Sequence, residues 1–166
     1  ILAVTGWVDL LRDARIIGVT MIVFGLLLWW VHRTAPEARS APEWTMKDAL
    51  KMGLWQAVAL IPGVSRSGIT MTAARALGFR RHSAAKLSML MSIPITLATG
   101  GLLGLKVLKG GVSAALLGDV AVAAFLAFVS AWAALALMMR FLDRVSFTPY
   151  VIYRVILGVV LLALAL

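Results

Sequence analysis

Long apolar runs separated by short polar segments dominate this sequence of 166 residues. The runs cover residues 16–31, 87–105, 120–139 and 155–166. An α-helix needs about 20 mainly apolar residues to cross the hydrocarbon core of a bilayer. The pattern therefore predicts an all-α integral membrane protein, a polytopic helix bundle forming one transmembrane domain over residues 1–166. We expect its transmembrane helices over residues 14–32, 84–106, 118–141 and 147–166.

Composition and charge agree with a membrane protein. Hydrophobic residues make up 62% of the chain and charged residues 14%, whereas soluble domains average about a quarter charged residues. The formal net charge is +9, and the basic residues flank the apolar runs. We attribute this charge to topology and to contact with membrane lipids rather than to nucleic acid binding.

Residues 46–79 follow a helical pattern that is interrupted in its middle. Thr45 is a predicted N-cap, with Asp48 at the third helical position, and the first helical piece stops at Pro62. The two pieces are about 16 and about 11 residues long, or about 24 Å and 16 Å, so neither alone crosses a core of about 30 Å. They form either one broken helix that crosses the membrane or a re-entrant helix-loop-helix hairpin.

The distribution of basic residues favours the hairpin. A broken crossing splits the basic residues six against seven between the two sides, which gives no bias. A hairpin places four on the outer side, namely Arg12, Arg15, Lys106 and Lys109. It places nine on the cytoplasmic side, namely Arg33, Arg39, Lys47, Lys51, Arg80, Arg81, Lys86, Arg140 and Arg144. Because cytoplasmic loops carry an excess of Lys and Arg, we predict the hairpin.

The loop at residues 62–68 carries the chemistry. It lies within the stretch ALIPGVSRSGIT. We predict that Ser67 caps the second helical piece, with Gly68 at its first position, and that Gly63 and Gly68 allow positive φ and close approach. The free N–H groups of a helix start favour anions, and the guanidinium of Arg66 suits phosphate. The alternative is that Arg66 is a buried charge paired with a carboxylate, while the serines satisfy the backbone.

The segment QAVALIPGVSRSGITMTAARALGF closely resembles the second signature of the undecaprenyl-diphosphatase family of bacitracin-resistance type, whose pattern is PGxSRSxxT. KLSMLMSIPI is similar to the serine-bearing helix that follows in that family, and FTPYVIYRVILG is similar to its ending. The resemblance covers essentially the whole chain, in order. It implies removal of one phosphate from C55-isoprenyl diphosphate, which recycles the lipid carrier for cell-wall synthesis and confers bacitracin resistance.

The resemblance also implies a site and a fold. Ser65, Arg66 and Thr70 would be the catalytic residues. The diphosphate-binding residues would be Gly63, Ser65, Arg66, Ser67, Gly68 and Thr70. The fold would be half of an inverted-repeat architecture. The site would open to the extracytoplasmic side of the bacterial inner membrane. Whether the protein forms an oligomer is left open. A divalent cation, Mg²⁺ or Ca²⁺, is expected from the resemblance and not from the residues of this chain.

The acidic signature of the family is missing. The seven acidic residues all lie in linkers or at helix ends, so the sequence predicts no metal ligands in this chain. The chain opens as ILAVTGWVDLLRDAR, without methionine. We therefore expect a C-terminal portion whose carboxylates and histidine come from a missing N-terminal half. The alternative function is a transporter or flippase of an anionic prenyl phosphate lipid, because re-entrant half-helices are also a transporter device.

Three further points stay open at this level. Ser65 acts either as a nucleophile or as a ligand. A nucleophilic serine needs an adjacent base, and the sequence shows none near Ser65, which favours the ligand. Arg154 lies inside the last apolar run and either reaches the interface or pairs within the bundle. Ser88 and Ser92 share a helical face and predict hydrogen bonds to a neighbouring helix.

Overall fold

A computed structural model describes residues 13–109, 114–142 and 145–165. Its regular elements are α-helices and short 3₁₀ helices, as the apolar pattern predicts. The α-helices are α2 (Ala14–Thr34), α3 (Met46–Ala57), α4 (Arg66–Ala76), α5 (Arg81–Lys109), α6 (Ala114–Leu142) and α7 (Thr148–Ala165). The 3₁₀ helices are η2 (Ala41–Glu43) and η3 (Val58–Leu60).

Four of the described helices are long and apolar enough to cross a membrane. The stretches that qualify are Ala14–Thr34, Arg81–Leu105, Gly118–Arg140 and Thr148–Ala165. The chain is thus a multi-pass, all-helical membrane protein. It divides into two compact units: the first ends at Met89 and resumes at Val145, and the second runs from Leu90 to Arg144.

The second unit contains the later part of α5 and all of α6. Many of its described large apolar side chains are exposed, including Leu97, Phe128 and Leu137, each at more than 65%. In water such exposure would be unfavourable, whereas in a bilayer these side chains face hydrocarbon that is as apolar as they are. The packed core of the chain therefore lies in the first unit.

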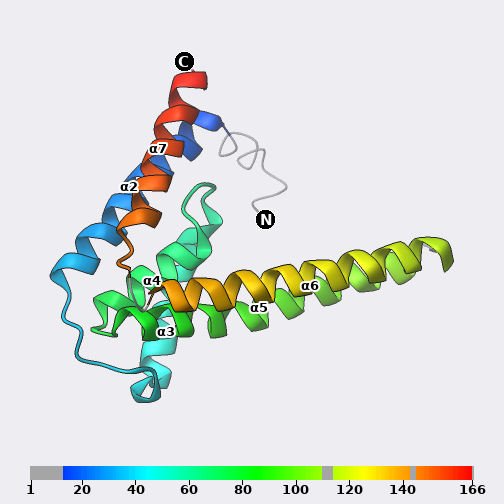
Figure 1. Ribbon diagram of the computed structural model, residues 1–166, viewed down its shortest axis with the longest axis horizontal. Helices are drawn as coiled ribbons and strands as arrows, with labels where there is room; N and C mark the ends of the chain where they lie inside the picture. The colour runs from blue at the N-terminus through cyan, green and yellow to red at the C-terminus, as the bar shows by residue number, and fades with distance from the viewer. Residues whose placement is uncertain (1–12, 110–113, 143–144, 166) are drawn as a thin grey trace. The chain divides into compact units, whose positions relative to one another are not determined.

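Helices α2 and α7 of the first unit pack side by side, as Figure 1 shows. Small residues allow the close approach: a Cβ on Gly18 would lie 2.9 Å from the carbonyl oxygen of Gly158, and a Cβ on Gly158 would lie 2.8 Å from that of Gly18. The two helices are antiparallel. Arg15 at the start of α2 donates from Nε to the carbonyl of Ala165 at the end of α7, so these two ends lie together. Small residues at such an interface are typical of helix packing in membranes.

Helices α3 and α4 pack against each other and form a helix-loop-helix hairpin. The predicted N-cap of α3 is confirmed: the Thr45 hydroxyl accepts from the Asp48 amide at 3.3 Å, and the Asp48 carboxylate accepts from the Thr45 amide at 3.0 Å. At the open end of the hairpin, the Arg39 amide donates to Gly78 and the Arg80 amide donates to Arg39, both at 2.9 Å. The chain thus enters and leaves the hairpin at one place.

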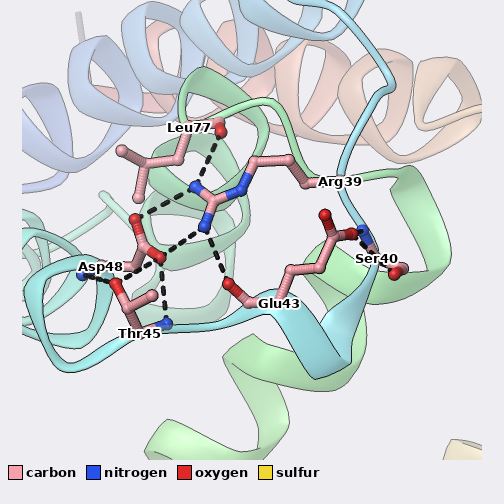
Figure 2. Close-up of polar contacts among 6 residues, drawn as sticks. All are labelled: Arg39, Ser40, Glu43, Thr45, Asp48 and Leu77. Atoms are coloured by element: carbon pink, nitrogen blue, oxygen red, sulfur yellow. Dashed lines mark hydrogen bonds and ion pairs between the residues drawn. The ribbon is translucent and has the colours of Figure 1, made fainter.

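Arg39 fastens this open end with its side chain as well (Figure 2). Its guanidinium donates to both carboxylate oxygens of Asp48, at 3.1 and 2.7 Å. It also donates to the carbonyls of Glu43, at 2.9 Å, and of Leu77, at 3.3 Å. One side chain therefore ties the segment before α3, the start of α3 and the end of α4 together. Re-entry of this hairpin into a bilayer, and an inverted repeat, stay predictions.

Candidate functional site

The loop between α3 and α4 is held tightly against α2. The Thr20 hydroxyl donates to the carbonyl of Pro62 at 2.7 Å. Gly63 has φ +87°, and a Cβ at this position would collide with the Thr20 hydroxyl and with the backbone of Ile17. Only glycine satisfies both the left-handed backbone and the close approach. The predicted positive φ at Gly63 is confirmed.

Ser65 is the N-cap of α4. Its backbone has φ +68° and ψ +114°, and its hydroxyl oxygen accepts from the Gly68 amide at 3.3 Å. The prediction that Ser67 caps the helix is wrong: the Ser65 carbonyl already accepts from the Ile69 amide at 3.0 Å, so α4 begins at Arg66. Gly68 accordingly lies in the first turn of α4 and not in the left-handed region. A positive φ costs a serine about 1–3 kcal/mol and is concentrated at functional sites.

Hydroxyl groups converge on this helix start from three elements. The Ser65 hydroxyl lies 3.4 Å from the Ser67 hydroxyl and 3.1 Å from the Tyr150 hydroxyl of α7. Thr70 donates to the carbonyl of Arg66 at 2.9 Å, and its oxygen lies 2.6 Å from the Ser88 hydroxyl of α5. Thr70 and Ser88 are both buried. The predicted hydrogen bond from Ser88 to a neighbouring helix is confirmed.

Arg66 is exposed at the first position of α4. In the described part of the chain no carboxylate oxygen lies within 4.0 Å of its side-chain nitrogens. The alternative reading of Arg66 as a buried, paired cation is therefore wrong for these residues. Arg66 and Thr70 lie four positions apart in α4 but differ in burial: the Arg66 side chain is exposed, whereas Thr70 is buried.

Helix α7 contributes two residues that the sequence did not assign to the site. Arg154 is 3% exposed and donates from Nη2 to the carbonyl of Gly63 at 2.6 Å. It therefore lies within the bundle, which decides between the two readings of this residue. Tyr150 contacts Ser65, as described above. The sequence offered one signal for these two residues: Tyr150 and Arg154 are four positions apart, and residues at that spacing share a face of a helix.

Carboxylates lie elsewhere. Glu37 is 3.5 Å from both Arg75 and Arg81, and Asp48 binds Arg39. Within the described residues, no three His, Asp or Glu side chains gather as potential metal ligands. The loop itself offers hydroxyls, carbonyls and guanidinium groups, whereas Mg²⁺ and Ca²⁺ sites are built on carboxylate oxygens. The described residues of the loop therefore suit an oxyanion and do not by themselves suit a divalent cation.

An exposed arginine, a helix N-terminus and clustered hydroxyls define a candidate oxyanion site. The class is therefore an all-helical membrane protein with this site in a helix-loop-helix hairpin. Comparison with known proteins gives the family. Residues 2–160 match the family model described as Bacitracin resistance protein BacA, and the chain belongs to this family. The resemblance inferred from the SRS motif is thus confirmed.

Curated relatives are similar along nearly the whole chain. The undecaprenyl-diphosphatase of Ruegeria pomeroyi is 58% identical over 161 residues, which cover 97% of this chain and 60% of the relative. That of Jannaschia sp. is 56% identical over 164 residues, covering 99% of this chain and 61% of the relative. That of Chromohalobacter salexigens is 45% identical over 152 residues, covering 92% and 57%. The chain thus spans about three fifths of the length of the curated relatives that it matches.

Proposed function

We propose that this protein acts as a membrane phosphatase that converts undecaprenyl diphosphate to undecaprenyl phosphate. The observation that carries the proposal is Ser65, whose strained backbone places its hydroxyl at the start of α4, next to Arg66. Membership of the BacA family and the names of the curated relatives support the same substrate. This reaction would recycle the lipid carrier for cell-wall synthesis and confer resistance to bacitracin.

The site residues would bind the diphosphate from one side. The guanidinium of Arg66 presents a planar pair of donors, which matches phosphate oxygens. The amides of Arg66 and Ser67 at the start of α4 would donate to the same anion, and the helix dipole favours its negative charge. Ser65 and Ser67 add hydroxyl donors, and Gly63 and Gly68 keep the backbone close. We expect Thr70 to contribute by fixing the first turn of α4, since its hydroxyl bonds to the Arg66 carbonyl.

The chemical step is hydrolysis of the diphosphate. A water oxygen attacks the terminal phosphorus, the bond from that phosphorus to the bridging oxygen breaks, and the lipid monophosphate leaves with inorganic phosphate as the second product. Negative charge grows on the bridging oxygen as the bond breaks. Donors fixed in advance around that charge lower the barrier because they need no reorganisation during the reaction. Arg66 is the residue best placed for this role.

Ser65 acts in this proposal as a ligand of the diphosphate and not as the nucleophile. A nucleophilic serine needs an adjacent base, and among the described residues the side chains bonded to the Ser65 hydroxyl are those of Ser67 and Tyr150. Rapid acid quenching with labelled lipid diphosphate, followed by mass analysis of the Ser65 peptide, tests this assignment. A phosphoserine that accumulates at the rate of turnover would make Ser65 the nucleophile.

The remaining parts of the proposal concern the surroundings of the site. We place the protein in the bacterial inner membrane, with the hairpin re-entering from the cytoplasmic side and the site open to the extracytoplasmic side. A divalent cation would neutralise the diphosphate, and its carboxylate ligands would come from outside the described residues. In this proposal these ligands belong to a further N-terminal half of the protein.

The experiment is phosphate release from C55-isoprenyl diphosphate by the full-length protein in detergent, where there is no membrane gradient. We expect stoichiometric release of inorganic phosphate and lipid monophosphate. A transporter or flippase of an anionic prenyl phosphate lipid binds the same head group but releases no phosphate. Binding without release would therefore contradict the phosphatase and favour the transporter.

A further inference from the structure

Arg154 is a buried cation that has few partners. Its side chain is 3% exposed, and the carbonyl of Gly63 accepts from Nη2 at 2.6 Å. Within the described residues, Nη1 and Nε have no hydrogen-bond partner, and no carboxylate lies within 4.0 Å of the guanidinium. A buried charge is unfavourable unless an opposite charge and hydrogen bonds compensate it. Two donor atoms of Arg154 and its charge are thus left without a partner among the described residues.

Arg75, another buried arginine among the described residues of the same unit, illustrates a structural role. It is 0% exposed, and its two Nη atoms donate to four carbonyls, those of His32, Ala35, Pro36 and Phe79. Glu37 lies 3.5 Å from Nη2. Arg75 therefore finds both hydrogen bonds and a countercharge within the chain, whereas Arg154 finds a single carbonyl and the ring of Tyr150, whose centroid lies 5.8 Å from Cζ. The difference points to a ligand at Arg154.

Nη1 of Arg154 is directed at the start of α4. A Cβ built on Gly68 would lie 2.8 Å from Nη1 and 3.3 Å from the Ser65 hydroxyl oxygen, so these two atoms are at most about 6 Å apart. Two donors at this separation can both bond to one phosphoryl group, since each N–H···O or O–H···O bond spans about 2.7–3.0 Å. Gly68 is the residue between them, and its lack of a side chain allows Arg154 to approach.

We propose that Arg154 is a further anion-binding residue of this site, and that a bound phosphoryl group, rather than a carboxylate of the described residues, is its countercharge. Arg66 would hold the anion from the exposed side of the loop, and Arg154 would hold it from the buried side. The low dielectric around Arg154 strengthens its attraction for an anion. The identity of the ligand as a diphosphate rests on the proposed function. The presence of an anion site at Arg154 does not.

The test is binding of methylenediphosphonate, a diphosphate that cannot be hydrolysed, to the detergent-solubilised full-length protein by calorimetry in the presence of Mg²⁺. We expect Arg154→Gln to weaken binding by about tenfold or more, because a hydrogen bond to a charged partner is lost. Arg75→Gln is the matched control. It should lower the thermal stability of the protein and leave the dissociation constant of the folded protein within about twofold.

Gly68→Ala provides a second variant that leaves all charges in place. Alanine is favourable in a helix, but its Cβ would displace Nη1, so binding should weaken without loss of folding. The inference would be overturned if Arg154→Gln or Gly68→Ala bound the diphosphonate as tightly as the wild type. It would also be overturned if the wild type did not bind the diphosphonate. A wild type that binds the diphosphonate through Arg154 yet releases no phosphate from the lipid would contradict only the proposed function.

Discussion

The hydroxyl of Ser65 lies 3.1 Å from the hydroxyl of Tyr150, although the two residues are 85 positions apart in the sequence. This contact joins the motif loop to α7, the last helix of the chain. It orients a hydroxyl that the positive φ of Ser65 already directs at the start of α4. The loop is therefore positioned from two directions, by its own backbone and by a distant helix.

Tyr150→Phe removes one partner of the Ser65 hydroxyl and leaves the ring in place. Loss of a hydrogen bond between neutral groups costs about 0.5–1.5 kcal/mol, so we expect phosphate release from the lipid diphosphate to slow by about 2- to 13-fold. Tyr153→Phe is the control, because Tyr153 is 61% exposed and should keep the wild-type rate. Equal rates for the two variants would show that Tyr150 does not orient Ser65.

Gly158→Ala tests the close packing of α2 and α7. The added Cβ would lie 2.7 Å from Ile22 and 2.8 Å from the carbonyl oxygen of Gly18. Because backbone must then move, we expect the protein to lose about 1–3 kcal/mol of stability. Gly100→Ala is the control, since its Cβ meets nothing within 4 Å and alanine favours a helix by up to about 1 kcal/mol. Thermal unfolding in detergent measures both; a Gly158→Ala protein as stable as the wild type contradicts the packing.

Asp48 should give the hairpin a pH-dependent stability. Its hydrogen bonds from Arg39 hold the pKa of the carboxyl well below its ordinary value of about 4. A carboxyl with a lowered pKa in the folded protein stabilises it above that ordinary value and loses the effect as the pH falls. We expect Asp48→Asn to lose about 1–2 kcal/mol at pH 7, allowing for the partial exposure of Arg39.

The difference between wild type and Asp48→Asn should shrink as the pH is lowered below about 4, where the wild-type carboxyl begins to be protonated in the unfolded state. Unfolding in detergent at pH 7, 5 and 3 measures this. Asp119→Asn removes an exposed carboxylate and controls for the loss of one negative charge. A stability difference that stays constant with pH would mean that the Arg39–Asp48 pair contributes little.

The hairpin also predicts a membrane topology. Arg39 and Phe79 pair through their backbones, so we predict that the two ends of the hairpin lie on the same side of the membrane. Single cysteines at Ala38 and Lys86, both exposed, should react with an impermeant reagent only in inside-out vesicles. A cysteine at Arg15, at the opposite end of α2, should react only from the other side. Opposite labelling of Ala38 and Lys86 would rule out re-entry.

The sequence predicted the fold where the signal was local. Runs of apolar residues give the membrane helices, and Thr45 with Asp48 marks the start of α3, because hydrophobic period and capping depend on neighbours in the chain. The SRS motif located the loop for the same reason. The start of α4 was placed two residues too late, since nothing local indicates that Ser65 adopts a positive φ. Serine rarely does so, and tertiary contacts impose it here.

The residues of α7 that contact the loop could not be predicted from the sequence. Tyr150 and Arg154 reach Ser65 and Gly63 only because α2 and α7 pack closely through Gly18 and Gly158. Contacts between residues so far apart depend on the packing of several helices and leave no periodic signal. The spacing of four residues between Tyr150 and Arg154 shows only that they share a face of α7.

The most direct test of the phosphatase assignment is phosphate release from C55-isoprenyl diphosphate by full-length wild type and Arg66→Ala in detergent, with Arg80→Ala as an exposed control. We predict that wild type and Arg80→Ala release phosphate at similar rates. Arg66→Ala should lose about 2.7–4 kcal/mol of transition-state stabilisation, or about 100- to 1,000-fold in rate, by analogy with removal of one oxyanion donor. Near-normal turnover by Arg66→Ala would contradict the assignment of this loop as the site.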